Sequence, residues 1–367
     1  MAADMTQTAI PFLFMRGGTS RGPYLNRADL PQDMDALAQV LVAMVGSGHP
    51  LNIDGIGGGN AVTTKVAMLS RSDHPWADID YFFAQVSVED GTVDFKPTCG
   101  NILSGVGPAA IEMGLIAATG KKTTVKIHAV NTGARVVAKV QTSPDGVVYD
   151  GDASIDGVPE TAAPVALQFM DTIGGATGAL LPTGHLIDTF DGIDVTCMDV
   201  AMPMVIARAD SFGLTGYESA ADLNNNAAFF ARMEAVRIQA GEAMGIKDVA
   251  KSVTPKFGLL AKAQGRGTIA TRYFMPWSTH PTMAVTGAQC LASCVLTPNT
   301  VAEGLAVRSN ERPATITLEH ASGQIDVLVD YDLNANGIDL RSAGLVRTAR
   351  LLARGDVMIP RTVWDGK

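Results

Sequence analysis

The sequence predicts an α+β fold in which antiparallel or mixed sheets surround a few helices. Strand-like runs are numerous along the 367 residues, whereas segments with helical periodicity are few and widely spaced. Apolar residues make up 47% and charged residues 18% of the chain, as in globular proteins. A doubly wound parallel sheet is not expected, because it would need a helix at nearly every crossover between strands. The length is sufficient for two domains.

Strands are expected where apolar and β-branched residues cluster between turn residues. The runs 81–88 and 92–95 are separated by Glu89-Asp90-Gly91, which predicts a hairpin with a glycine-bearing turn. The expected strands are 10–15, 65–69, 79–88, 123–128, 165–170, 193–199, 204–207 and 325–329.

Helices are expected where apolar residues recur every three or four positions. Two helices are marked by the series Met34, Leu37, Leu41, Met44 and the series Phe229, Met233, Val236, Ala240. A third helix is expected over 343–352, with Gly355 placed to end it.

The charge and the apolar pattern exclude several classes of protein. The chain has 37 acidic and 28 basic residues, a formal charge of −9, and no run of Lys and Arg, so neither a nucleic-acid nor a membrane partner is expected. No apolar stretch approaches the roughly 20 residues that span a bilayer, and the N-terminus lacks the cationic start of a secretory signal. The four cysteines form no disulfide framework. We therefore expect a cytoplasmic protein, and an anionic substrate would be held by few, local cations.

The segment 15–22 (Met-Arg-Gly-Gly-Thr-Ser-Arg-Gly) directly follows the first expected strand. Glycines let the backbone approach a ligand closely, and consecutive N–H groups can hold a carboxylate. Arg16 adds a forked donor that suits carboxylates. The alternative interpretation is a tight surface turn.

Lys65 follows a second glycine-rich segment, 54–60 (Asp-Gly-Ile-Gly-Gly-Gly-Asn), at the start of an expected strand. The segment is not a phosphate-binding loop, because the Gly-Lys-Ser/Thr ending is missing and no helix follows. A lysine in this place is ordinarily a solvated strand end. Beside a cleft, desolvation would instead lower its pKa and make it a usable base.

Cys99 lies in the segment Thr98-Cys99-Gly100-Asn101, just before a glycine-rich helix start. Helix N-termini lower the pKa of a thiol, which favours a reactive cysteine. A free cysteine is more often buried and inert. The neighbouring Gly, Asn and Ser residues are poor core residues, so we favour the functional interpretation.

A fourth segment brings Arg272 and His280 near a second glycine-bearing helix start at Thr286-Gly287. Together these groups could clamp a carboxylate, although a lone histidine is more often structural. Two cysteines lie four residues apart on the following helix, at 290 and 294. With no other His or Cys nearby in the sequence, we interpret them as core residues and expect no metal.

These segments resemble the motifs of the methylaconitate isomerase and 4-oxalomesaconate tautomerase family. The likeness covers nearly the whole chain in order, and the segments 155–159, 195–199 and 212–218 resemble the tautomerase of gallate-type aromatic degradation most. The other matching segments are 15–20, 53–58, 65–67, 99–108 and 180–184.

The family is similar in fold to diaminopimelate epimerase, which implies two pseudo-symmetric α+β domains, each with a sheet around a central helix, and an active site between them. We expect the first domain over 1–185, completed by 351–367, and the second over 186–350. A weak likeness between 99–105 and 283–290 agrees with a duplication. Epimerases of this fold use two cysteines, and the counterpart of Cys99 at 285–287 (Val-Thr-Gly) has no thiol. The resemblance therefore favours the isomerase branch, in which a lysine matching Lys65 joins the first cysteine.

The resemblance implies a cofactor-independent 1,3-proton shift in an unsaturated tricarboxylic keto acid, 4-oxalomesaconate in particular, with Lys65 and Cys99 as proton carriers. The alternatives are a 2-methylaconitate cis–trans isomerase, an amino-acid epimerase and a non-catalytic tricarboxylate-binding protein. Whether the chain assembles into a homodimer is left open. Arg21 stands where lysine is common in the family. The residues implied to bind the di- or tricarboxylate are Arg16, Gly18, Thr19, Ser20, Arg21, Gly100, Asn101, Ser104, Arg272, His280, Thr286 and Gly287.

Overall fold

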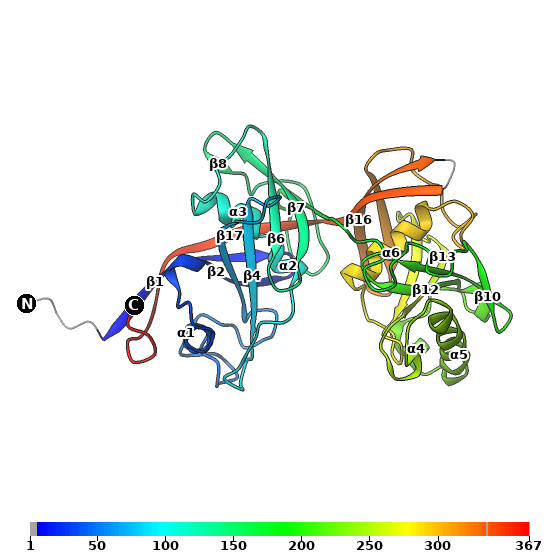
Figure 1. Ribbon diagram of the computed structural model, residues 1–367, viewed down its shortest axis with the longest axis horizontal. Helices are drawn as coiled ribbons and strands as arrows, with labels where there is room; N and C mark the ends of the chain where they lie inside the picture. The colour runs from blue at the N-terminus through cyan, green and yellow to red at the C-terminus, as the bar shows by residue number, and fades with distance from the viewer. Residues whose placement is uncertain (1–5, 335–336, 367) are drawn as a thin grey trace, which may run out of the picture. The chain divides into compact units, whose positions relative to one another are not determined.

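The computed structural model describes residues 6–334 and 337–366. It divides into two compact units, the first made of Met1–Leu167 with Val346–Lys367 and the second of Gln168–Leu345 (Figure 1). No helix in these described ranges is long and apolar enough to cross a membrane.

The first unit contains a mixed sheet. From β1 through β2, β3, β4 and β6 to β7, successive neighbours pair antiparallel, parallel, antiparallel, parallel and antiparallel. The last part of β17 (Gly337–Pro360) pairs with β1. The other elements are β1 (Gln7–Gly17), β2 (Ser20–Asn26), η1 (Arg27–Asp29), α1 (Met34–Val45), β3 (Lys65–Arg71), β4 (Ile79–Val86), β5 (Val93–Asp94), α2 (Gly100–Leu103), α3 (Val106–Glu112), β6 (Lys122–Ala129), β7 (Ala134–Ser143), β8 (Gly146–Val147) and β9 (Pro164–Phe169).

Helices cover both faces of this first sheet. Helix α1 begins after Asp33, whose carboxylate accepts a hydrogen bond from the Ala36 N–H, and ends at Gly46, whose φ of 77° is left-handed. The apolar side of α1 packs with Val66 and Met68 of β3 in one core cluster. Alternate strand residues point to the opposite face, where α2 and α3 contact β3.

The second unit repeats this pattern of pairing. From β11 through β12, β13, β14 and β15 to β16, successive neighbours again pair antiparallel, parallel, antiparallel, parallel and antiparallel. Its elements are β10 (Asp188–Phe190), β11 (Ile193–Asp199), β12 (Pro203–Arg208), η2 (Asp210–Phe212), α4 (Ala220–Asn224), α5 (Ala227–Ala243), η3 (Val249–Lys251), β13 (Lys256–Lys262), β14 (Ile269–Phe274), α6 (Val285–Leu296), β15 (Ala314–His320), β16 (Gly323–Asn334) and the first part of β17.

Helices also cover both faces of the second sheet. Helix α5 packs with Phe257 and Phe274 in one core cluster. Helix α6 packs with Leu260 and Tyr273, which point to the other face, in a second cluster. Figure 1 shows α6 lying among the strands, with α4 and α5 together on the other side of the sheet.

The structure confirms the expected strands and two of the three helices. The eight expected strands coincide with β1, β3, β4, β6, β9, β11, β12 and β16, although 79–88 runs two residues past β4 and 165–170 one residue past β9. The helical series fall in α1 and α5. The predicted hairpin is also present: Val86 pairs with Val93, and Gly91 in the turn has a φ of 64°.

The helix expected over 343–352 is wrong, because this segment belongs to β17. The strand pairing slips by one residue at Arg341, between the pairs Asp330–Ser342 and Tyr331–Leu340. It slips again at Leu352, between the pairs Phe14–Ala353 and Met15–Leu351. Each slip is a bulge that interrupts the alternation of inward-facing and outward-facing residues by which a strand is recognised in a sequence. Gly355 lies inside the strand instead of ending a helix.

The boundaries between the units differ from the expected ones at 185/186 and 350/351. The segment before 185 is held to the second unit, since the Asp199 carboxylate accepts hydrogen bonds from the backbone N–H groups of Ala176 and Thr177. The start of the C-terminal segment belongs to the first unit, since Ala349 and Arg350 pair with β1.

Candidate active site

Lys65 is the first residue of β3 and follows an ordered glycine-rich loop. The loop is held by the buried side chain of Asn52, whose amide donates to the Gly46, His49 and Val88 carbonyls and whose Oδ1 accepts from the Gly59 N–H at 2.8 Å. The loop therefore delivers Lys65 to the sheet in a fixed position.

Gly22 of β2 lies directly beside Lys65. A Cβ atom added to Gly22 would lie 1.8 Å from the Lys65 carbonyl oxygen, so only glycine allows this approach. The close contact fixes the backbone of Lys65 against β2.

The Lys65 amine has neutral neighbours. Its Nζ donates to Gln85 Oε1 at 2.9 Å and lies 5.5 Å from the centre of the Phe83 ring. Among the described residues no carboxylate pairs with it. An amide partner positions the amine and, unlike a carboxylate, forms no ion pair with it.

Cys99 precedes α2 with an extended backbone, φ −134° and ψ 108°. Its carbonyl accepts hydrogen bonds from the Leu103 N–H at 2.9 Å and from the Tyr81 hydroxyl at 3.4 Å. Cys99 is half-buried, whereas the other three cysteines are buried. The cysteine accessible to a substrate is thus the one at the start of α2.

Lys65 and Cys99 belong to the same face of the β3–β4 pair. Lys65 pairs with Gln85, and Leu69 pairs with Tyr81. Directly paired residues share a face, as do residues an even number apart on one strand. Tyr81 therefore points to the face of Lys65, and its hydroxyl reaches the Cys99 backbone.

Two buried tyrosines contact the backbone at the start of α2, Tyr81 at Cys99 and Tyr24 at Ile102. The Tyr24 hydroxyl donates to the Ile102 carbonyl at 2.5 Å. Burial, and then the charge of nearby Cys99, raise the pKa of Tyr24 and of Tyr81 well above the ordinary range. Both hydroxyls therefore stay protonated and act as donors to the first turn of α2.

The predicted residues Gly18, Asn101 and Ser104 meet at Thr348 of β17. The Gly18 N–H donates to the Thr348 carbonyl at 2.9 Å, and Ser104 Oγ donates to the Asn101 carbonyl at 2.6 Å and approaches the Thr348 carbonyl at 3.4 Å. Gly18 has a φ of 53°, and a Cβ added there would lie 2.2 Å from Asn101 Oδ1. A glycine is required where this loop passes over α2.

Arg16 joins the same cluster. Its Nη1 donates to the Gly18 carbonyl at 2.9 Å and to both oxygens of Thr348 at 3.0 Å. Burial and the neighbouring Arg350 lower the pKa of Arg16 from its ordinary value, but a guanidinium remains charged at neutral pH. Arg16 thus braces the loop with one nitrogen while it brings a positive charge to the site.

The remaining predicted residues of this unit have different surroundings. Arg21 lies 5.3 Å from the centre of the Phe14 ring, and its guanidinium is close to Gly58 of the second glycine-rich loop. Thr19 is exposed and Ser20 is buried. Gly100 is half-buried in the first turn of α2. The turn at Gly17 and Gly18 therefore lies against α2, and both belong to the first unit.

In the second unit, three predicted residues lie around Tyr273. A Cβ added to Gly287 would lie 2.2 Å from the Tyr273 ring, so the ring packs on the first turn of α6, which contains Thr286. The His280 ring lies edge-on to Tyr273 at 5.8 Å, and burial lowers the pKa of His280.

Arg272 is not brought together with these residues. It is next to Tyr273 on β14, so its side chain points to the opposite face of the sheet. There its Nε donates to the Glu218 carbonyl at 2.7 Å. Alternation along one strand separates two neighbours that are adjacent in the sequence.

Sequence reasoning missed Tyr24, Tyr81, Gln85 and Thr348, and it gave Gly22 no role of its own within the segment 15–22. Gln85 and Tyr81 share the period of the predicted strand that pairs with Lys65, which was an available signal. Nothing in the sequence indicated a role for Thr348, because its segment, 343–352, was predicted to be a helix.

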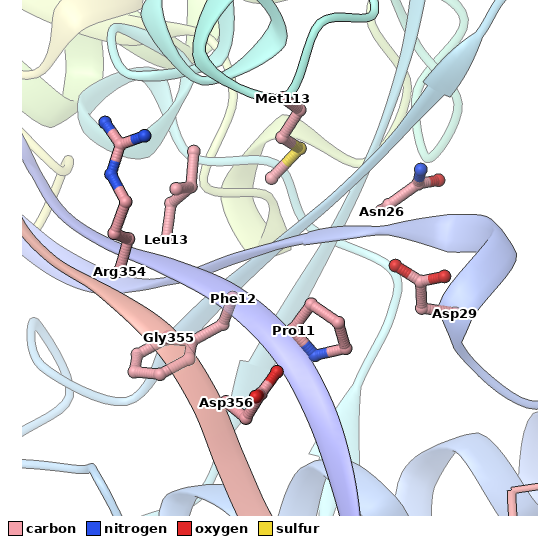
Figure 2. Close-up of a pocket in the computed structure, with 9 residues that line it drawn as sticks. All are labelled: Pro11, Phe12, Leu13, Asn26, Asp29, Met113, Arg354, Gly355 and Asp356. Atoms are coloured by element: carbon pink, nitrogen blue, oxygen red, sulfur yellow. The ribbon is translucent and has the colours of Figure 1, made fainter.

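A surface cavity of about 400 Å³ in the first unit lies elsewhere (Figure 2). It is lined by β1, β2 and β17 residues such as Phe12, Asn26 and Arg354, and none of the predicted site residues lines it. Its arginine already pairs with the Glu112 carboxylate at 2.6 Å. This cavity therefore offers no free cation to an anionic substrate.

Comparison with known proteins decides the family. The pattern of the PrpF protein family matches residues 7–360. The chain belongs to this family. A protein described as putative isomerase YbhH, of Escherichia coli (strain K12), is 49% identical, over 96% of this chain and 99% of that protein. The 4-oxalomesaconate tautomerase of Pseudomonas putida is 44% identical, over 99% of both chains.

A solved structure shares the fold. The crystal structure of a methylitaconate-delta-isomerase matches with a TM-score of 0.88 and 32% identity, over 98% of this chain and 97% of that one. The family resemblance carried by the sequence motifs is thus confirmed, and the chain is an enzyme of the isomerase class.

Proposed function

We propose that this chain catalyses a cofactor-independent 1,3-proton shift in an unsaturated tricarboxylic keto acid, with 4-oxalomesaconate as the substrate. The observation that carries the proposal is the placement of the Lys65 amine and Cys99 on one face of the β3–β4 pair. The 44% identity to a 4-oxalomesaconate tautomerase supports the choice of substrate.

The chemistry needs two proton carriers and donors for negative charge. In 4-oxalomesaconate an α-keto acid is conjugated to an alkene, so the allylic C–H is acidic. Its removal gives a dienolate, and return of a proton one allylic position away completes the shift. Preorganised donors aimed at the dienolate lower the barrier to its formation.

Lys65 is the base in this proposal, and Cys99 delivers the second proton. The order reverses if the substrate binds in the opposite pose. The charged group of Arg16 and the polar groups of Asn101 and Ser104 would hold the carboxylates. The partner of Lys65 is the neutral Gln85, which positions the amine without the ion pair that would hold it in its charged, non-basic form.

Replacement of either proton carrier tests the proposal. Lys65→Met and Cys99→Ala should each lower kcat by at least about 10²-fold, the typical contribution of a general acid or base. Lys122→Met is the matched control, since Lys122 is also the first residue of a strand and is exposed. Turnover of 4-oxalomesaconate is followed by absorbance and by deuterium incorporation from heavy water. Near-normal turnover in both variants would contradict the proposal.

2-Methylaconitate is the second candidate substrate, because the same pair of residues can remove and return an allylic proton. The 31% identity to the 2-methyl-aconitate isomerase of Cupriavidus necator, over 96% of this chain and 98% of that protein, supports keeping this alternative. Turnover of both acids by the same preparation separates the two candidates.

An amino-acid epimerase is disfavoured by the second unit. Such an enzyme would need a second thiol at the start of α6, where the capping residue is Ala284. Cys290 and Cys294 lie farther along α6 and are buried. The repeated strand pairing and the central helices support a diaminopimelate epimerase-like architecture with this one difference.

A further inference from the structure

Strand β17 extends beyond two of its three partners at its C-terminal end. Over 353–360 it pairs with β1 along one edge. Its pairing with β16 ends at Leu345, and β9 lies near Ser342, to which the Gln168 amide donates a hydrogen bond at 3.3 Å. Strand β9 has six residues, so it ends well before the C-terminal part of β17. In the described part of the chain, no strand pairs with the second edge of β17 over 352–358, which we call the open edge.

The open edge is also exposed on one of its side-chain faces. Arg354 and Asp356 line the surface cavity shown in Figure 2. Two apolar side chains, Leu352 and Met358, are 47% and 42% exposed. A row of unpaired N–H and C=O groups is a template for a further strand, and 352–358 contains neither the proline nor the lysine that commonly prevents such pairing. The open edge can therefore accept another strand.

The open edge of a second copy could pair with it only in certain registers. The backbone groups that point to one edge of a strand belong to alternate residues. Two copies of one strand therefore pair antiparallel only when the residue numbers that lie opposite each other are both odd or both even. A two-fold axis then passes through one residue, which lies opposite itself.

An axis at Gly355, the centre of the open edge, gives complementary contacts. It places Arg354 opposite Asp356 of the second copy on each side of the axis, and it places Leu352 opposite Met358. An axis at Arg354 or at Asp356 would instead place two like charges directly opposite each other, which is destabilising. The charges along the open edge thus favour the register that pairs it over its full length.

The side chains of Arg354 and Asp356 are available for these contacts. Arg354 uses Nη2 in its hydrogen bond to the Glu112 carboxylate at 2.6 Å, which leaves further N–H donors, and its side chain is 60% exposed. Within the described ranges, the Asp356 carboxylate has no hydrogen-bond or ion-pair partner. Pairing between two copies therefore breaks no contact that these side chains already make.

We propose that the open edge of β17 is the surface through which two copies of this chain associate. The two strands pair antiparallel about a two-fold axis at Gly355, and reciprocal Arg354–Asp356 pairs fix the register. The association joins the first-unit sheets of the two copies through their β17 strands. It depends only on the edge strand, and it stands or falls independently of the proposed function.

Sedimentation velocity of the full chain tests the proposal. At a chain concentration of about 50 µM, well above the Kd of a micromolar dimer, the unmodified chain should sediment with about twice the 38.3 kDa of one chain. Asp356→Arg places arginines opposite each other in both pairs, and Arg354→Asp does the same with aspartates. Each substitution should raise the Kd of the dimer at least about tenfold.

An equimolar mixture of the two variants tests the register. A dimer of one Asp356→Arg chain with one Arg354→Asp chain again has unlike charges in both pairs, so its Kd should return to within about tenfold of the unmodified value. This recovery also shows that both variants are folded.

Asp339→Arg is the matched control, because Asp339 is exposed on the same strand where β17 pairs with β16. It should dimerise as the unmodified chain does. A monomeric unmodified chain, an unchanged Kd in Asp356→Arg, or a mixture that stays monomeric overturns the proposal.

Discussion

Cys99 differs from the other cysteines in its surroundings. Burial, and then the Asp188 carboxylate, raise the pKa of Cys197 to about 12. Burial raises the pKa of Cys290 well above its ordinary value and that of Cys294 to about 12. These three residues stay protonated at neutral pH and are shielded from solvent, so they behave as core residues.

Alkylation of the native protein should therefore be confined to Cys99. Iodoacetamide at pH 7.5 is expected to modify Cys99, which is half-buried, and to abolish turnover. Peptide mass spectrometry with and without denaturant measures which cysteines react. Cys99→Ala is the control and should take up no label before unfolding. Full native labelling of Cys197, Cys290 or Cys294 would contradict this account of the site.

The residues that the sequence proposes for the candidate site are marked by local signals. Lys65, Gly18 and Asn101 stand in glycine-rich segments that are unusual for ordinary loops. Their partners could not be predicted in the same way. Gln85 is 20 residues from Lys65, and Thr348 is 332 residues from Arg16. Such pairs depend on strand register, which a single sequence does not reveal.

At the level of elements, strands that keep a regular alternation were predicted well. Strand β11 (Ile193–Asp199) has the predicted bounds, and β1 and β3 extend the predicted ones by a few residues. The region 343–352 failed, because it is rich in Ala, Leu and Arg, which favour helices, and because bulges at Arg341 and Leu352 break its alternation. Pairing with β1 and β16 outweighs that local preference.

The contact between β2 and β3 at Gly22 gives a test at this scale. Gly22→Ala should lower the free energy of unfolding by about 1–3 kcal/mol, because the new methyl group would overlap the Lys65 carbonyl. It should also lower kcat about 10²-fold, since displacement of Lys65 by about 1 Å disturbs the reacting geometry. Chemical denaturation and turnover measure the two effects.

Gly175→Ala is the control for Gly22→Ala, because a Cβ there meets nothing within 4 Å. Its unfolding free energy should change by less than about 0.5 kcal/mol. A Gly22→Ala protein with unchanged kcat would show that the position of Lys65 does not depend on this contact.

At the scale of the whole molecule, the chain returns to its first unit after it completes the second. Strand β17 pairs with β16 as far as Leu345, and from Ala349 onward it pairs with β1. Between these parts, Thr348 accepts hydrogen bonds from Gly18 and Arg16. The candidate site in the first unit is therefore completed by residues that follow the second unit in sequence.

Truncation after Leu345 should thus destroy the site while the second unit survives. Every residue of β1 from Gln7 to Gly17 would lose its partner in β17, and Arg16 would lose Thr348. We expect no measurable turnover, with hydrogen exchange by mass spectrometry showing loss of protection in β1 and β2 and retained protection in α6. Truncation after Pro360 is the control: it keeps the whole of β17, so turnover should persist. Turnover by the 1–345 protein would show that the site does not need its C-terminal strand.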